Sequence, residues 1–164
     1  MAGSLTPGAG ETPAMTSITE QGDAGLLRRL GALVYDALLV AALMMVTTAL
    51  FLPLTRGEAI TPGSSGWLEY LYQATLLAVI VGFFGIFWTR GGQTLGMMAW
   101  RLKVLREDGR ALNWKDAVKR LAAAWLSAAV LGLGYLWILV DARRRTWHDR
   151  LSHTRVVLIP GKKK

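Results

Sequence analysis

The sequence predicts an all-α membrane protein with two transmembrane helices, a glycine-interrupted third apolar segment and a small cytoplasmic β-hairpin or sheet. The chain has 164 residues, of which 52% are hydrophobic, and it contains two long apolar runs. About 20 apolar residues are enough to cross a hydrocarbon core that is roughly 30 Å thick. The formal net charge of +8 fits an anionic membrane surface better than nucleic acid, because it accompanies a high apolar content.

The first predicted span covers about residues 30–54 and carries one charged residue, Asp36. Pro53 lies at its far end, where a proline can stop a helix. Residues 1–24 are rich in Gly, Thr, Ser and Pro and lack the basic start and apolar run of a secretory signal peptide. We therefore expect them to form a disordered tail, and we expect the membrane domain to cover about residues 25–160.

The second predicted span covers about residues 67–88, with Trp67 and Trp88 at its two ends. Tryptophan at both ends of an apolar run is typical of the two membrane–water interfaces. The alternative is a pair of buried helices in a soluble protein. It is disfavoured because soluble core helices rarely run this long without a polar face.

A β-hairpin is predicted over about residues 99–112, where apolar and basic side chains alternate before an Asp108-Gly109 turn. Period-two alternation that ends at Asp-Gly is typical of hairpins. Residues 154–159 also have the composition of a strand. We expect this strand to pair with the edge of the hairpin, which would give a three-stranded sheet. Residues 161–164 form a basic tail.

The third apolar segment, about residues 114–141, follows a helix-capping candidate at Asn113 and is interrupted by Gly132 and Gly134. Each half is too short to span a membrane alone. The arginines before the first span place the N-terminus in the cytoplasm by the positive-inside rule. A third full span would put the strongly basic residues 142–164 outside. We therefore favour a re-entrant or interfacial segment, with three full spans as the alternative.

Three segments, in this order, resemble the RDD family of bacterial membrane proteins: RRLGALVYD at 28–36, TRGGQTLGMMAWRLKVLREDGRAL at 89–112 and VDARRRTWHDRLSHTRVVL at 140–158. The resemblance implies a multi-pass protein of the bacterial inner membrane. The arginine and two aspartates for which the family is named match Arg29, Asp36 and, most naturally, Asp141. For function, the resemblance implies transport, including cation/proton exchange for some members.

Arg29 and Asp36 lie seven residues apart, which places them on one helix face. Their axial separation of about 10 Å is too long for a direct ion pair, so each needs another partner. One hypothesis makes Asp36 a proton or cation site gated by Arg29, because an aspartate in hydrocarbon is costly and faces the bundle interior. The other makes Arg29, Asp36 and a tail residue a structural network. Asp141 and Asp149 are the acidic candidates beyond the first helix.

Five basic residues are predicted to bind anionic lipid headgroups: Arg143, Arg144, Arg145, Arg101 and Lys103. No metal or other cofactor is predicted, because the chain has no cysteine and only two histidines. No catalytic residues are predicted either, since no nucleophile–base set can be assembled. The adjacent His148 and Asp149 are interpreted as part of an interfacial turn.

Two function classes follow from these observations. The first is a small transporter, expected to be a homo-oligomer because two or three membrane segments barely enclose a pathway. The second is a non-transporting accessory protein that binds lipid or another membrane protein through a basic cytoplasmic face. An enzyme and a nucleic-acid-binding protein are both disfavoured.

Overall fold

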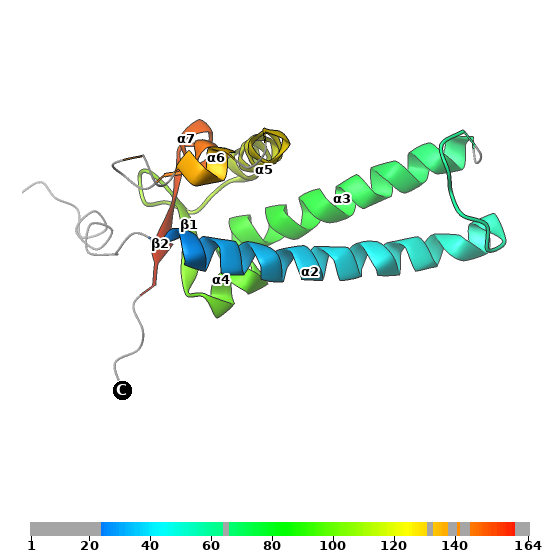
Figure 1. Cartoon of the computed structure of the whole chain (residues 1–164), viewed down its shortest axis with the longest axis horizontal. Coiled ribbons are helices and arrows are strands. Elements are labelled where there is room, and N and C mark those ends of the chain that lie inside the picture. The colour runs from blue at the N-terminus through cyan, green and yellow to red at the C-terminus, as the bar shows by residue number, and fades with distance from the viewer. Residues whose placement is uncertain (1–23, 64–65, 131–132, 138–140, 142–144, 160–164) are drawn as a thin grey trace, which may run out of the picture.

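The computed structural model describes residues 24–63, 66–130, 133–137, 141 and 145–159. Two long helices form an antiparallel pair: α2 (Leu26–Phe51), which continues into the 3-10 helix η1 (Leu52–Thr55), and α3 (Trp67–Arg90). The other described elements gather where α2 begins and α3 ends (Figure 1). We call this part the head. It comprises α4 (Leu95–Ala99), β1 (Leu102–Arg106), α5 (Trp114–Ala129), α6 (Leu133–Leu136), α7 (Trp147–Leu151) and β2 (Thr154–Leu158).

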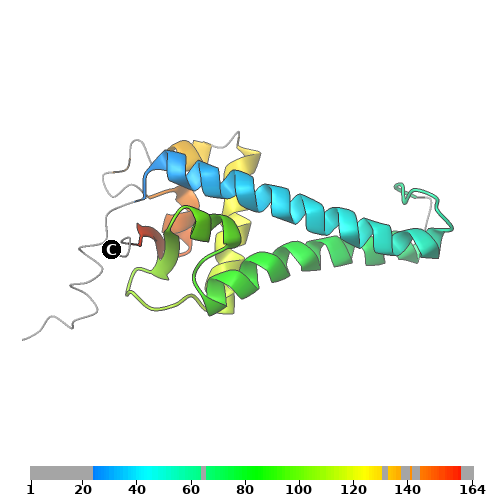
Figure 2. The same cartoon turned by 90° about the horizontal axis from the view of Figure 1, so that it is seen from below.

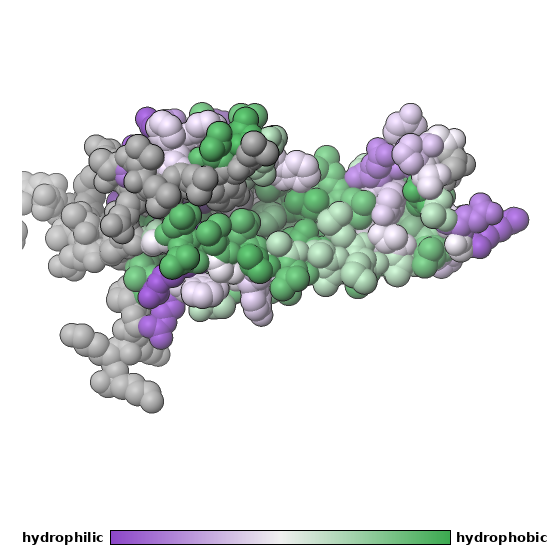
Figure 3. All heavy atoms as spheres, viewed as in Figure 1, coloured by the Kyte–Doolittle hydropathy of each residue, from purple (hydrophilic) through white to green (hydrophobic). Residues whose placement is uncertain are grey.

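The helix pair has the length and the exposed apolar surface of membrane-spanning helices. Leu26–Thr55 and Trp67–Arg90 are both long and apolar enough to cross a membrane. Only 6% and 11% of their most apolar stretches are buried, whereas the core helices of a soluble protein would be mostly buried. Figure 3 shows this apolar surface along the pair, between the polar far loop and the head. The prediction of two membrane-length helices is confirmed.

Helix α5 lies across the axis of the α2–α3 pair and not alongside it (Figures 1 and 2). It begins at the predicted capping residue, since Asn113 Oδ1 accepts a hydrogen bond from Asp116 N at 2.8 Å. The described part of the third apolar segment consists of α5, with 16 residues, and α6, with 4. Neither is long enough to span a bilayer. Gly132, the first of the two interrupting glycines, lies outside the described residues.

The sheet joins two segments that are distant in the sequence. β1 and β2 pair antiparallel, from Leu102 opposite Leu158 to Arg106 opposite Thr154. This pairing replaces the hairpin predicted over 99–112. The turn itself forms, because Arg106 O accepts from Gly109 N at 2.9 Å and Gly109 has a φ of +82°, but the residues after it are not a strand.

The second edge of β1 is already occupied, which explains why no hairpin forms. Val104 N donates to Gly92 O, and Gln93 Nε2 donates to Leu102 O, both at 2.7 Å. A returning strand would need the same backbone groups. Gly92 has a φ of +68°, and a Cβ at this position would lie 2.7 Å from Val104 O. Glycine is therefore required for this close backbone approach.

The hydrophobic core lies in the head, on the face of the sheet that is covered by helices. Leu102, Val104 and Val156 are between 0% and 5% exposed. They pack with residues from four helices: Ala32, Trp88, Met97, Ala117 and Leu121. The core therefore attaches one end of both long helices to α4, α5 and the sheet.

Candidate functional site

Asp149, in the first turn of α7, lies between two arginines from different helices. Its Oδ2 accepts from Arg29 Nη1 and its Oδ1 accepts from Arg120 Nη1, each at 2.5 Å. The Arg29, Arg120 and Asp149 side chains are 10%, 5% and 0% exposed. We call these three residues the Arg–Asp–Arg cluster. Because desolvating charges is costly, we expect the cluster to specify how α2, α5 and α7 pack rather than to add net stability.

Further hydrogen bonds extend the Arg–Asp–Arg cluster to neighbouring segments. Arg29 Nε donates to Ala24 O at 3.1 Å, and Arg120 Nη1 donates to Thr154 Oγ1 at 2.5 Å. Thr146 N donates to Asp149 Oδ2 at 3.2 Å, which holds the first turn of α7. Ala24, which the sequence assigns to the disordered tail, is fully buried here. The remainder of that tail, residues 1–23, lies outside the described residues.

The environment of the cluster determines the charge states of Asp149 and His148. Burial alone would raise the pKa of the Asp149 carboxyl, but the Arg120 and Arg29 guanidiniums hold this pKa well below its usual range. Burial, together with the charge of Arg120, lowers the pKa of His148 from 6.5 to about 3, although Asp149 acts in the opposite direction. Asp149 is therefore ionised and His148 is neutral near pH 7. The cluster thus contains two positive charges and one negative charge.

Asp36, on α2, is bound by α4 and not by the Arg–Asp–Arg cluster. The Thr94 hydroxyl donates to Asp36 Oδ2, and Gly96 N donates to Asp36 Oδ1 at 2.8 Å. Thr94 also caps α4, because its Oγ1 accepts from Met97 N at 3.2 Å. Asp36 is 3% exposed. The GQTLG segment therefore supplies both hydrogen-bond donors for the carboxylate in the first long helix.

The predicted network of Arg29, Asp36 and Asp141 is not a single cluster in the structure. Asp141 Oδ2 accepts from Arg145 N at 2.9 Å and lies 3.6 Å from Arg145 Nε. The acidic partner of Arg29 is Asp149, the other acidic candidate beyond the first helix. Asp149 lies in the capping box at the start of α7 and accepts from Arg29, whereas Asp141 pairs with Arg145, four residues away.

The residues predicted to bind lipid headgroups have different environments. Arg101 is exposed, Lys103 is half-buried in β1, and Arg145 Nη1 donates to Glu107 Oε1 at 2.8 Å. Arg145 is therefore engaged in ion pairs within the head. Arg143 and Arg144 lie outside the described residues.

Arg120 and Thr94 are site residues that the sequence did not predict. Arg120 lies on the buried face of α5 with Ala117 and Leu121. A basic residue on the apolar face of an amphipathic helix was the available signal, because such a residue needs a buried partner. Thr94 gave no comparable signal, since its contact with Asp36 depends on how α4 folds back against α2.

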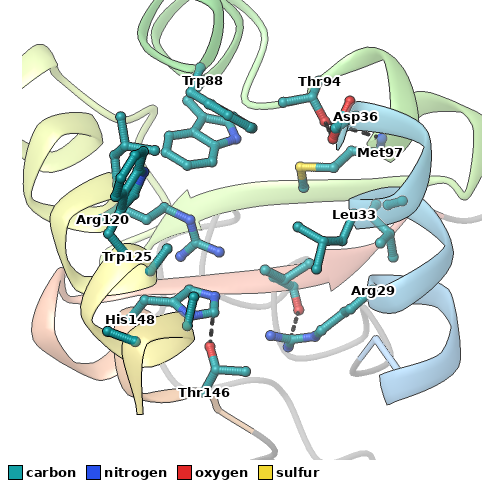
Figure 4. A pocket seen from close by; sticks show the side chains of 18 residues that line it. Arg29, Leu33, Asp36, Trp88, Thr94, Met97, Arg120, Trp125, Thr146 and His148 are labelled. Atoms are coloured by element: carbon teal, nitrogen blue, oxygen red, sulfur yellow. Dashed lines mark hydrogen bonds between the residues drawn. The ribbon is translucent and has the colours of Figure 1, made fainter. Parts of the chain in front are cut away.

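A cavity of about 560 Å³ lies between the Arg–Asp–Arg cluster and the Asp36 contact (Figure 4). Its walls come from α2, α3, α5 and the sheet, with contributions from the turns around α4 and α7. Polar groups enter from several of these walls: Arg29, Asp36, Thr94, Arg120, Thr146 and His148. The other lining residues are apolar. Among the residues that the structure describes, no group of three or more His, Asp or Glu could hold a metal ion.

Two membrane-length helices and a small, partly charged head define a helical protein of membrane type. A model of the RDD family matches residues 23–153. The chain therefore belongs to the RDD family, as the resemblance predicted. An uncharacterized protein of Rickettsia prowazekii (strain Madrid E) is 32% identical over 87 residues. This match covers 53% of the chain and 49% of the relative, so the chain spans about half the length of the curated relative that it matches. No solved structure matches the chain.

Proposed function

We propose that this protein is a non-transporting accessory protein of the bacterial inner membrane and that it binds anionic lipids through its head. The observation that carries the proposal is that both buried charges of α2 have binding partners within the head. Arg29 is paired with Asp149, and Asp36 is bound by Thr94 and Gly96. Structural contacts thus account for both charges without an ion pathway. The proposed role has no catalytic step, and it allows homo-oligomers or a membrane-protein partner at the exposed apolar faces of α2 and α3.

The distribution of charge supports a cytoplasmic head and a cytoplasmic N-terminus. Lysine and arginine residues concentrate in the head, whereas Arg56 is the one basic residue in the described part of the loop between α2 and α3. Positive charge near the ends of membrane helices favours the cytoplasmic side. The anionic lipids of that leaflet would then face the basic head.

The exposed surface of α5 supports a position in the membrane interface. Trp114, Val118 and Trp125 form an apolar stripe, and they are 50%, 48% and 57% exposed. Lys115 and Lys119 are exposed beside this stripe. A helix with one apolar face and flanking lysines suits the boundary between acyl chains and anionic headgroups. This placement corresponds to the interfacial form of the predicted third apolar segment.

Single-cysteine labelling tests this placement, because the natural chain has no cysteine. In intact cells, we expect a membrane-impermeant maleimide to label Glu58→Cys and to leave Asp108→Cys unlabelled. After permeabilisation, Lys119→Cys should react several-fold faster than Val118→Cys, although both positions are exposed in the protein. Labelling of Asp108→Cys in intact cells would contradict a cytoplasmic head. Equal rates at positions 118 and 119 would contradict an interfacial α5.

Cation/proton exchange is the second candidate function, and one observation favours it. Asp36 is 3% exposed, lies within the first membrane-length helix and lines the cavity. A buried carboxylate at such a position can act as a proton or cation site in a transporter. Its two hydrogen bonds to α4 support the structural role instead, so the two candidates make different predictions for the same substitution.

Proteoliposome flux with Asp36→Asn separates the two candidates. For the accessory role, we expect no proton-coupled flux of Na⁺, Li⁺ or K⁺ in the wild type. Asp36→Asn should lower the free energy of unfolding by about 1–2 kcal/mol, because a charged hydrogen-bond acceptor is lost. Thr94→Val is the matched control, because it removes a donor to Asp36 and keeps the carboxylate. Wild-type flux that persists in Thr94→Val and disappears in a folded Asp36→Asn variant would establish transport.

A further inference from the structure

We propose that the cavity binds the phosphate head of one anionic membrane lipid, whose acyl chains leave between α2 and α5. The inference deepens the proposed function and rests on it for the position of the head at the membrane surface. The ligand class follows from three properties of the cavity: donors without partners, the balance of charge, and a large apolar surface that opens toward the lipid.

Two residues that line the cavity each carry a buried donor that has no hydrogen-bond partner among the described residues. The two donors are Trp88 Nε1 and Arg120 Nε. Trp88 is 7% exposed and Arg120 is 4% exposed, so neither donor faces bulk solvent. The Arg120 guanidinium carbon lies 5.3 Å from the centre of the Trp88 ring, which keeps the two donors close together. Figure 4 shows both side chains projecting into the cavity from different walls. Buried donors of this kind are expected to have an acceptor.

The charge at this end of the cavity favours an anionic acceptor. Arg29 and Arg120 share one carboxylate, that of Asp149, and the adjacent His148 is neutral near pH 7. Asp36 is the acidic residue in the cavity lining, and its oxygens accept from the α4 turn. A phosphate placed against Arg120 would offset the excess positive charge and accept from the free donors. Arginine is well suited to phosphate, because its guanidinium presents several donors in one plane.

The size and lining of the cavity favour an amphiphile over a small inorganic anion. A volume of about 560 Å³ is in the range of sites for organic ligands, which are mostly apolar with a few polar groups. Beyond the arginines, the lining is formed by apolar residues that acyl chains would contact: Leu33, Phe84, Met97, Leu121, Trp125 and Ala128. The polar and apolar parts together match an amphiphile.

The mouth of the cavity opens where lipids would be located. Leu33 on α2 and Trp125 on α5 both line the cavity, yet they are 40% and 57% exposed. Arg29 is the fourth residue of α2, and Trp88 is the third from the end of α3. Arg29 and Trp88 therefore lie at the ends of the membrane-length helices, which is the depth of lipid headgroups. A lipid could enter laterally, with its phosphate at the arginines and its chains toward the bilayer.

Native mass spectrometry of the full-length protein in detergent tests the inference. After delipidation, the protein is titrated with phosphatidylglycerol, with phosphatidylcholine of the same chains, and with inorganic phosphate. We expect one phosphatidylglycerol to bind at high salt, because buried ion pairs are screened less than surface ones. Phosphatidylcholine should bind at least about ten-fold more weakly, given the loss of net negative charge. Inorganic phosphate should not displace the lipid, because it lacks the apolar contacts.

Two variants and one control locate the bound lipid. Trp88→Phe keeps a ring beside Arg120 and removes the indole donor, so it should weaken phosphatidylglycerol binding about five- to ten-fold. Ala128→Phe should strongly weaken binding, because its ring would occupy the part of the cavity that the acyl chains need, without lowering thermal stability. Trp67→Phe is the control, because Trp67 begins α3 at the end away from the head, is 75% exposed and does not line the cavity, and it should bind as the wild type does.

Each contrary outcome has a defined meaning. Equal binding of the two lipids, or wild-type binding by Trp88→Phe and Ala128→Phe, would overturn the inference. Displacement by inorganic phosphate would also overturn it, because the site would then serve the free anion. Binding of several phosphatidylglycerol molecules that disappears at high salt would leave the proposed surface function in place and remove the cavity site.

Discussion

Asp149→Asn is expected to lower the free energy of unfolding by about 3–5 kcal/mol, the cost of breaking a buried ion pair by removing one partner. Asparagine has nearly the same shape and can still accept from Thr146 N. It carries no charge, however. The two positively charged guanidiniums of Arg29 and Arg120 would therefore be buried side by side without an anionic partner. We expect α5 and α7 to separate from α2 before the helix pair itself is disturbed.

Thermal and denaturant unfolding in detergent at several pH values measures this effect. Asp108→Asn is the matched control, because Asp108 is 45% exposed and its ion-pair distances to two arginines are 3.9 Å. Such a surface pair contributes about 0–1 kcal/mol. The folded-state pKa of Asp149 lies well below its unfolded value, so the stabilisation is complete above about pH 5 and is lost in acid. The difference between wild type and Asp149→Asn should therefore be constant from pH 5 to 8.

Two results would contradict this role of Asp149. A loss of stability no larger than that of Asp108→Asn would mean that the cluster does not organise the head. If the stability difference between wild type and Asp149→Asn disappeared as the pH fell from 8 to 5, Asp149 would not be held ionised by its two arginines. Adding Arg120→Met to Asp149→Asn should restore part of the stability, because it removes one of the two unpaired charges.

Gly96→Ala is expected to lower the free energy of unfolding by about 1–3 kcal/mol, the usual range for overpacking. A Cβ on Gly96 would lie 2.9 Å from Asp36 Cγ and would also meet the Ala32 carbonyl oxygen. Both neighbours belong to α2, and a backbone carbonyl cannot move aside as a flexible side chain can. Helix α4 would be pushed away from α2, which would lengthen the hydrogen bonds that Thr94 and Gly96 donate to Asp36.

Gly82→Ala provides a matched control for Gly96→Ala. Gly82 is also helical, and a Cβ there would have no heavy atom within 4 Å. Alanine favours helix over glycine, so this variant should be neutral or more stable by up to about 1 kcal/mol. The midpoint of thermal unfolding should fall for Gly96→Ala and stay or rise for Gly82→Ala. Equal responses of the two variants would show that α4 is not packed as closely against α2 as the structure requires.

The long helices could be predicted from local composition, because the requirement for about 20 apolar residues acts on each segment independently. The start of α5 was also predictable, since the Asn113 cap is a contact between residues three apart. The sheet was not. The alternation over 100–104 predicts a strand, but the choice of partner depends on which segments the tertiary structure brings to each edge. Gly92 and Gln93 form hydrogen bonds with one edge of β1, and β2 pairs with the other edge.

The site was predictable only in part, for a related reason. Asp36 stood out because a charge in an apolar run needs a partner. Arg29 stood out through the family resemblance and through its place on the same helix face as Asp36. The identity of each partner could not follow from one-dimensional spacing. Arg29 and Asp149 are 120 positions apart, and Asp36 and Thr94 are 58 apart.

The sequence by itself therefore determined the two membrane-length helices, the basic character of the chain, and the residues of α2 that need buried partners. Only the tertiary structure decided that Asp36 binds the α4 turn, that Arg29 shares Asp149 with Arg120, and that a cavity lies between these contacts. The physical reason is one of range. Hydrophobic length and capping act between neighbours along the chain, whereas the pairing of buried charges depends on which distant segments the packed core brings within hydrogen-bond distance.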